Sequence, residues 1–109
     1  MIRSINDCTK LRNGVLMPWF GLGVWQSLGD DATRAVKWAV EAGYRAIDTA
    51  YAYHNEKEVG EGIRQSGIER KELFLVTKVN FKSYENAEQA VLKSLENLQT
   101  DYIDLLLLH

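Results

Sequence analysis

The sequence contains little cysteine or proline and no long hydrophobic run. It has one cysteine, Cys8, and one proline in 109 residues. A single cysteine cannot form an internal disulfide, which is typical of a reducing compartment, and we interpret Cys8 as incidental. No apolar stretch approaches the roughly 18 residues that a membrane-spanning helix needs. Residues 1–8 also lack the apolar core of a signal peptide. We therefore expect a cytoplasmic protein without a membrane partner.

Neither sign of charge is in large excess. The 13 basic and 15 acidic residues are well mixed along the chain and give a formal net charge of -2. Because no basic run or patch stands out, the sequence predicts no nucleic-acid partner. Hydrophobic residues make up 46% of the chain, which is enough for the core of one domain of ordinary size.

The chain begins with the pattern of a β-hairpin. Two short apolar runs flank Asn13-Gly14, which predicts a hairpin over residues 9–17 in which both central residues take a positive φ. Pro18 is expected to end this hairpin. Residues 20–25, F-G-L-G-V-W, then predict a first strand. Its G-x-G lacks the third glycine of a dinucleotide-binding fingerprint, so we interpret both glycines as positions of close backbone approach.

Three later segments have the periodicity of amphipathic helices. The first begins near Asp30 or Asp31, either of which is expected to cap it, and ends before Gly43. The second runs from about residue 56 to 66 and starts with a capping box, Asn55-x-x-Glu58. The third presents one stripe of small and apolar residues: Ala87, Ala90, Val91, Ser94, Leu95 and Leu98.

Short apolar strands alternate with these helices, and each of the last three strands leads to a titratable residue. Ala46 and Ile47 precede Asp48, residues 73–77 precede Lys78, and residues 103–108 precede His109. This alternation predicts an α/β fold with four parallel strands, right-handed crossovers and three helices. In such sheets the chemistry collects at the carboxyl ends of the strands, so Asp48, Lys78 and His109 are expected at one edge.

A phenol on the loop after Asp48 completes this group, and the pattern alone leaves both Tyr51 and Tyr53 as candidates. An ammonium group beside a phenol favours the phenolate, and a carboxylate can hold the ammonium in place. A neutral imidazole can donate a hydrogen bond to a carbonyl oxygen. The four side chains together predict a site that donates a proton to a carbonyl receiving a hydride.

Four collinear segments resemble the aldo-keto reductase family. They are G-L-G-V-W-Q, G-Y-R-A-I-D-T-A-Y-A-Y-H-N-E-K-E-V-G-E-G-I-R, L-F-L-V-T-K-V and S-L-E-N-L-Q-T-D-Y-I-D-L-L-L-L-H. The resemblance covers nearly the whole chain. It implies a (β/α)8 TIM barrel, with an N-terminal hairpin closing the bottom and a nicotinamide cofactor at the carboxyl-end mouth.

The resemblance also implies roles for individual residues. Tyr53, five residues after Asp48, takes the position of the proton donor, which favours it over Tyr51. Lys78 takes the position that activates this tyrosine, and Asp48 that of the carboxylate paired with Lys78. His109 takes the position that orients the carbonyl group.

The same resemblance implies binding positions for cofactor and substrate. Gly23, Val24 and Asp48 would lie beside NADPH, while Trp25, Tyr53 and His109 would contact an aldehyde or ketone. No metal ligand is expected. The preference for NADPH comes from the family alone. Residues 79–83 depart from the tryptophan-containing loop that the family often has after this lysine.

A full barrel of this type needs about 250 residues, so we expect these 109 residues to form its N-terminal half. We expect residues 1–109 to be one partial domain, with the hairpin at 9–17 and the first four barrel strands with their helices at 20–109. The resemblance places most of the cofactor contacts, including those to its phosphates, in the other half. The isolated chain could therefore be inactive, although its full-length form would be a monomeric carbonyl reductase.

Two other functions remain open. Because the first and last strands would be unpaired edges, the chain could be a non-catalytic half-barrel that self-associates or pairs with another chain. A nicotinamide-sensing regulatory subunit is a third alternative, but the presence of all four site residues gives no reason to prefer it.

Overall fold

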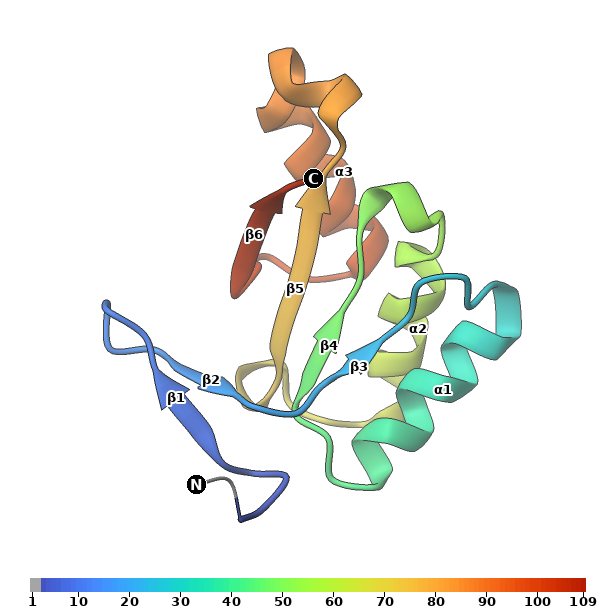
Figure 1. Ribbon diagram of the computed structural model, residues 1–109. Coiled ribbons are helices and arrows are strands. Elements are labelled where there is room, and N and C mark those ends of the chain that lie inside the picture. The colour runs from blue at the N-terminus through green and yellow to red at the C-terminus, as the bar shows by residue number, and fades with distance from the viewer. Residues whose placement is uncertain (1–2) are drawn as a thin grey trace.

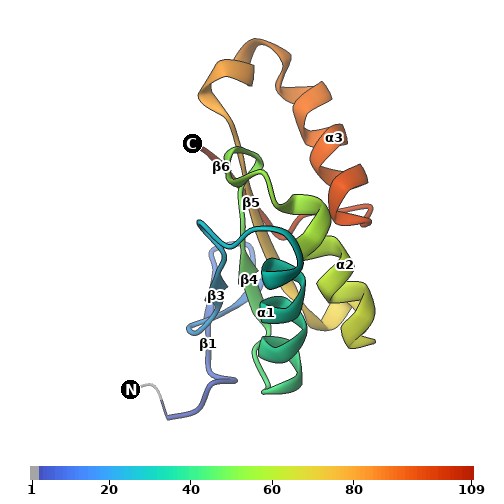
Figure 2. The same cartoon turned by 90° about the vertical axis from the view of Figure 1, so that its right-hand side faces the viewer.

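The computed structural model describes residues 3–109. These residues form a four-stranded parallel sheet with helices on one face and a separate antiparallel hairpin (Figure 1). Figure 2, turned by 90°, shows α1, α2 and α3 on the same side of the sheet. The expected α/β fold with four parallel strands, three helices and an N-terminal hairpin is therefore confirmed.

The hairpin consists of β1 (Cys8–Lys10) and β2 (Leu16–Pro18), paired with Thr9 opposite Met17. Pro18 ends the hairpin, as expected, because it is the last residue of β2 and lies opposite Cys8. A proline is tolerated there because it is at the strand terminus, where a missing N–H interrupts no ladder.

The turn of the hairpin differs from the expected one. Only Gly14 has a positive φ, 90°, so the expectation of a positive φ at Asn13 was wrong. The N–H of Gly14 donates to the carbonyl of Leu11, and the N–H of Leu11 donates to that of Val15, both at 2.8 Å. Asn13 instead accepts the N–H of Val15 with its side-chain oxygen at 3.1 Å. A longer loop with one left-handed glycine thus replaces the two-residue turn.

The parallel sheet has the strand order β3-β4-β5-β6. Its strands are β3 (Leu22–Gly23), β4 (Ala46–Asp48), β5 (Phe74–Val79) and β6 (Leu105–Leu108). Strands β3 and β6 are shorter than the sequence predicted. Of the two glycines interpreted as close approaches, only Gly21 is one, because a Cβ there would lie 3.0 Å from Ala46. A Cβ at Gly23 would meet nothing within 4 Å.

The helices are α1 (Gly29–Glu41), α2 (Glu56–Ser66) and α3 (Ala87–Leu98). Asp30 and Asp31 do not cap α1; they lie in its first turn, where their charge still complements the helix dipole. As predicted, α1 ends before Gly43; both Gly43 and Gly67, which follow α1 and α2, have a positive φ. Short 3-10 helices, η1 (Tyr51–Tyr53), η2 (Arg70–Glu72) and η3 (Phe81–Asn86), join the other elements. None of the helices in residues 3–109 has the length and apolarity to cross a membrane.

The two faces of the sheet have separate apolar clusters. Ile47 and Leu75 point toward the helices and belong to the main core. The alternate residues Ala46, Phe74 and Val76 face the other way and pack against side chains of the hairpin, Leu11 and Met17. Because side chains alternate along a strand, Asp48 and Lys78 share the face opposite the helices.

Candidate active site

The carboxyl ends of three neighbouring strands carry the predicted polar residues. Asp48 is the last residue of β4, and His109 directly follows β6. Lys78 was expected after its strand, but β5 continues through Lys78 to Val79, so the lysine is the last but one residue. Tyr53 ends η1, on the loop that follows β4. The parallel pairing of these strands brings Asp48, Lys78 and His109 to one edge, and the contact with Lys78 places Tyr53 there as well.

Lys78 is the centre of this group. Its ammonium nitrogen donates to Asp48 Oδ1 at 2.6 Å, to the carbonyl oxygen of Thr49 at 2.9 Å and to the hydroxyl oxygen of Tyr53 at 3.3 Å. Three acceptors match the three protons of an ammonium group. The side chain of Lys78 is only 13% exposed, whereas that of Asp48 is 50% exposed. The ammonium is therefore fixed in one position beside the phenol oxygen.

His109 completes the group from the last strand. Its ring meets the ring of Tyr53 edge-on, with 6.0 Å between centroids and an interplanar angle of 83°. Its backbone N–H donates to Val79 at 3.0 Å and its carbonyl accepts the hydroxyl of Tyr84, which holds the residue after β6 in place. The structure thus brings Asp48, Tyr53, Lys78 and His109 together, as the sequence predicted.

The two candidate tyrosines have different surroundings. Tyr53 is half-buried and contacts Lys78, as described above. Tyr51 is more exposed, and its ring lies 6.5 Å from that of His54 rather than beside the ammonium. The geometry therefore favours Tyr53 as the phenol of the site.

The three residues expected beside cofactor and substrate lie next to the Asp48 end of the sheet. Gly23 pairs with Asp48 in the parallel register and is exposed. Val24 is only 1% exposed and belongs to the core on the helix side, so its side chain is turned away from this edge. Its N–H donates to the backbone carbonyl oxygen of Asp48 at 3.2 Å. Trp25 is 69% exposed. Gly23 and Trp25 are therefore accessible at this edge, whereas the side chain of Val24 is not.

Sequence reasoning missed the role of Asn55. It is the residue before α2, but its side chain makes no capping hydrogen bond, so the predicted capping box was wrong. Its amide nitrogen donates to the carbonyl oxygens of Val24 and Ser27, both at 2.8 Å, and its oxygen accepts the hydroxyl of Thr49, also at 2.8 Å. These partners are 31, 28 and 6 residues away, so no local pattern could have indicated them.

A buried carboxylate lies behind the site, on the helix side of β5. Glu56 is 3% exposed and accepts hydrogen bonds from Thr77 at 2.7 Å, Ser94 at 3.0 Å and Asn97 at 3.4 Å. It therefore joins α2, β5 and α3 next to Lys78. The polar Thr77 within an otherwise apolar run was the only sequence signal for it.

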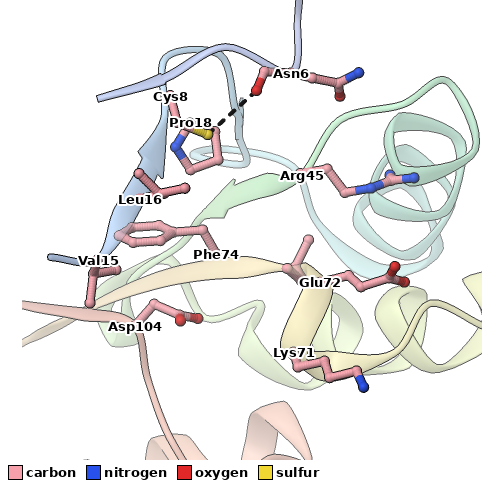
Figure 3. Close-up of a pocket in the computed structure, with 11 residues that line it drawn as sticks. Asn6, Cys8, Val15, Leu16, Pro18, Arg45, Lys71, Glu72, Phe74 and Asp104 are labelled. Carbon is pink, nitrogen blue, oxygen red and sulfur yellow. Dashed lines mark hydrogen bonds between the residues drawn. The ribbon is translucent and has the colours of Figure 1, made fainter. Parts of the chain in front are cut away.

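Two hollows flank the sheet. One, of about 280 Å³, reaches from the hairpin to Gly23, Asp48 and Leu107 and so adjoins the group of four residues. A larger one, of about 320 Å³, lies beside the hairpin at the opposite ends of the strands (Figure 3). There Arg45 donates to the carbonyls of Val40 and Tyr44. Because parallel sheets place chemistry at their carboxyl ends, we take the first hollow as part of the candidate site.

No three His, Cys, Asp or Glu side chains within residues 3–109 converge as metal ligands would. The side chains that meet at the carboxyl-end edge are a phenol, a fixed ammonium, a half-exposed carboxylate and an imidazole.

Comparison with known proteins identifies similar chains. The protein-family model described as Aldo/keto reductase family matches residues 19–109. The chain is 53% identical to glyoxal reductase of Bacillus subtilis over 112 residues, which cover 100% of this chain and 41% of that protein. It is 44% identical to glycerol 2-dehydrogenase (NADP(+)) of Saccharomyces cerevisiae, covering 100% of this chain and 36% of that protein.

The fold has a counterpart among solved structures. An aldo/keto reductase from Brucella melitensis matches with a TM-score of 0.89 and 47% identity, covering 94% of this chain and 41% of that one. The chain thus spans about two fifths of the length of these relatives.

Proposed function

Because the chain belongs to the aldo/keto reductase family, we propose that its site reduces small aldehydes or ketones to alcohols. The observation that carries this proposal is the contact of Lys78 with both Asp48 and Tyr53, at 2.6 and 3.3 Å. A phenol beside a fixed ammonium is suited to give up a proton, because the positive charge stabilises the phenolate that remains. The glyoxal reductase named above supports a small carbonyl compound as substrate.

Each residue of the group has one task in this proposal. A carbonyl that gains a hydride at carbon must gain a proton at oxygen, and Tyr53 donates it. Asp48 and Thr49 hold the ammonium of Lys78 in place through their oxygens. His109, edge-on to Tyr53, donates a hydrogen bond that orients the carbonyl oxygen. Trp25, which is exposed and follows Gly23 by two residues, supplies an apolar wall for the substrate.

NADPH is the proposed cofactor, and when bound it supplies the hydride. The name of the yeast glycerol dehydrogenase, which includes NADP(+), supports this choice. The open space at Gly23, next to Asp48 in the sheet, fits the flat nicotinamide end. Cations and backbone N–H groups both bind phosphates, and Lys78, the cation of this group, already donates to three acceptors. We therefore assign only the reacting end of the cofactor to this edge of the sheet.

The test is NADPH consumption with glyoxal and with an aromatic aldehyde. Tyr53→Phe should lower turnover by about 10²–10⁴-fold, the usual contribution of a general acid, while Tyr51→Phe, the matched control, should retain it. Two proteins should be assayed: the 109-residue chain, and a chimera in which this chain replaces the aligned part of the Bacillus subtilis glyoxal reductase. Full turnover by the Tyr53→Phe chimera would refute the proposed proton donor.

A second candidate function is self-association without catalysis. The edge strand β6 exposes Leu106, Leu107 and Leu108, the last to 74%, and an apolar edge strand is a template for pairing. Sedimentation velocity decides this point. A dimer of the 109-residue chain that Leu107→Lys dissociates would support it, whereas a folded monomer over the whole concentration range would rule it out.

A further inference from the structure

Trp25 lies in a tight turn that begins directly after Gly23, the residue paired with Asp48. The N–H of Ser27 donates to the carbonyl of Val24 at 3.0 Å, which closes a four-residue turn around Trp25 and Gln26. Gln26 has a φ of 66°, in the left-handed region that side chains other than glycine rarely adopt. Such a backbone persists only where its surroundings hold it.

Asn55 supplies that support. Its amide nitrogen donates to the first and the last carbonyl of the turn, those of Val24 and Ser27. Asn55 is 1% exposed, so water does not compete for these hydrogen bonds. Both protons of the amide are thereby used on one turn.

The oxygen of the same amide connects the turn to the ammonium of the site. It accepts the hydroxyl of Thr49, which is fully buried. The carbonyl oxygen of Thr49 in turn accepts a proton of Lys78. One buried side chain thus links the turn that carries Trp25 to the residue that contacts Lys78.

We propose that Asn55 is a positioning residue that fixes the Trp25 turn relative to the Lys78–Tyr53 pair. An amide is required, because the position needs two donors for Val24 and Ser27 and an acceptor for Thr49. The consequence for catalysis rests on the proposed function: Trp25 would be held where its ring packs against a bulky carbonyl substrate.

The test uses hydrogen exchange and 19F NMR on the 109-residue chain labelled with fluorotryptophan. Asn55→Asp keeps the shape of the side chain but removes both donors. We expect it to speed exchange of the Ser27 amide by about tenfold or more, as the loss of such hydrogen bonds implies. The Trp25 resonance should shift or broaden, while that of Trp38, on the outer side of α1, stays unchanged. Asn13→Asp, which retains its acceptor for Val15, is the matched control.

Two further variants separate positioning from general damage to the fold. Thr49→Val removes only the hydroxyl that donates to the side-chain oxygen of Asn55. It should therefore speed exchange of the Ser27 amide less than Asn55→Asp does. In an Asn55→Ala background, Gln26→Gly should restore protection of Ser27 in part, because glycine takes a positive φ without strain. If Asn55→Asp does not fold, Thr49→Val and this pair of variants decide the question. Unchanged Ser27 exchange and an unchanged Trp25 resonance in the folded variants would overturn the proposal.

Kinetics provide a second measurement on the same proteins. Asn55→Ala should raise KM for a bulky aromatic aldehyde by about tenfold while changing kcat and the KM for glyoxal little, since a loosened Trp25 no longer lines the pocket. Equal loss for both substrates would contradict the role assigned to Trp25. Absence of turnover in the wild-type chimera would count against the proposed function, and the exchange result would still decide whether Asn55 positions the turn.

Discussion

The ammonium nitrogen of Lys78 lies 2.6 Å from Oδ1 of Asp48, across the neighbouring strands β5 and β4. The two partners differ in their surroundings, because the side chain of Lys78 is 13% exposed and that of Asp48 is 50% exposed. Removing the Asp48 carboxylate therefore leaves a buried cation, whereas removing the Lys78 ammonium leaves a largely hydrated anion.

This difference predicts unequal effects on stability. Asp48→Asn should lower the free energy of unfolding by about 1–3 kcal/mol, because the buried ammonium loses its counter-charge. Lys78→Met should lower it by less than about 1 kcal/mol, because the remaining carboxylate is solvated. Urea unfolding of both variants measures this, and a larger loss in Lys78→Met would contradict it.

The positions of these two residues could be predicted from the sequence because each is the polar residue at the end of an apolar run. Parallel pairing then brings strand ends to one edge, whatever the loops do. The same reasoning placed His109 correctly, and the periodicity of residues 56–66 gave both ends of α2.

The role of Asn55 could not be predicted in this way. An asparagine directly before a helix is expected to cap it, yet the side-chain amide of Asn55 forms hydrogen bonds with Val24, Ser27 and Thr49 instead. Likewise Val24 follows a strand in an exposed segment, but its side chain is buried among the helices. Both features depend on contacts between segments distant in sequence, which local patterns do not encode.

A second prediction concerns Arg70, which holds the chain between α3 and β6. Its guanidinium pairs with Asp104 at 2.8 Å, donates to Thr100 and to the carbonyls of Leu73 and Tyr102, and lies 4.0 Å from the centroid of the Tyr102 ring. Lysine cannot reproduce this planar set of donors.

Arg70→Lys should therefore lower the free energy of unfolding by about 2–3 kcal/mol, since several partly buried acceptors lose their donors. Arg34→Lys is the control, because Arg34 pairs with Asp31 on the surface and should change stability by less than about 0.5 kcal/mol. Similar urea midpoints for the two variants would show that the Arg70 contacts do not stabilise the fold.

A third prediction concerns pH. Hydrogen bonds from Arg64 and then from Gln65 lower the pKa of Glu61 from 4.5 to about 2. Because this pKa is lower in the folded state than in the unfolded state, the carboxylate contributes stability above about pH 4.5, and this contribution is lost as the pH falls toward 2.

Glu61→Gln should accordingly be less stable than wild type at neutral pH, and the difference should shrink between pH 4.5 and about 2. The effect should also weaken in high salt, because the group is exposed and its charge is screened. Urea midpoints of both proteins across this pH range measure it. A difference that stays constant down to pH 2 would show that the Glu61–Arg64 pair is not the cause.

The last prediction compares two glycines, one in the packing of the helices and one at the candidate site. A Cβ at Gly62 in α2 would lie 2.6 Å from the carbonyl oxygen of Thr33 and 2.8 Å from Cβ of Val36, both in α1. Alanine favours a helix over glycine by about 1 kcal/mol. Relieving these contacts requires a shift of the α1 backbone, which costs more than this gain. Gly62→Ala should therefore be destabilising by about 1–3 kcal/mol overall.

Gly23→Ala should have the opposite profile. A Cβ there would meet no atom within 4 Å, so stability should change by less than about 0.5 kcal/mol. If the nicotinamide end of the cofactor occupies the space beside Asp48, the added methyl group should weaken NADPH binding by about tenfold or more. Binding to the chimera, followed by the quenching of tryptophan fluorescence, tests this separately from turnover. Unchanged affinity for NADPH in a stable Gly23→Ala chimera would mean that the cofactor does not approach the sheet at Gly23.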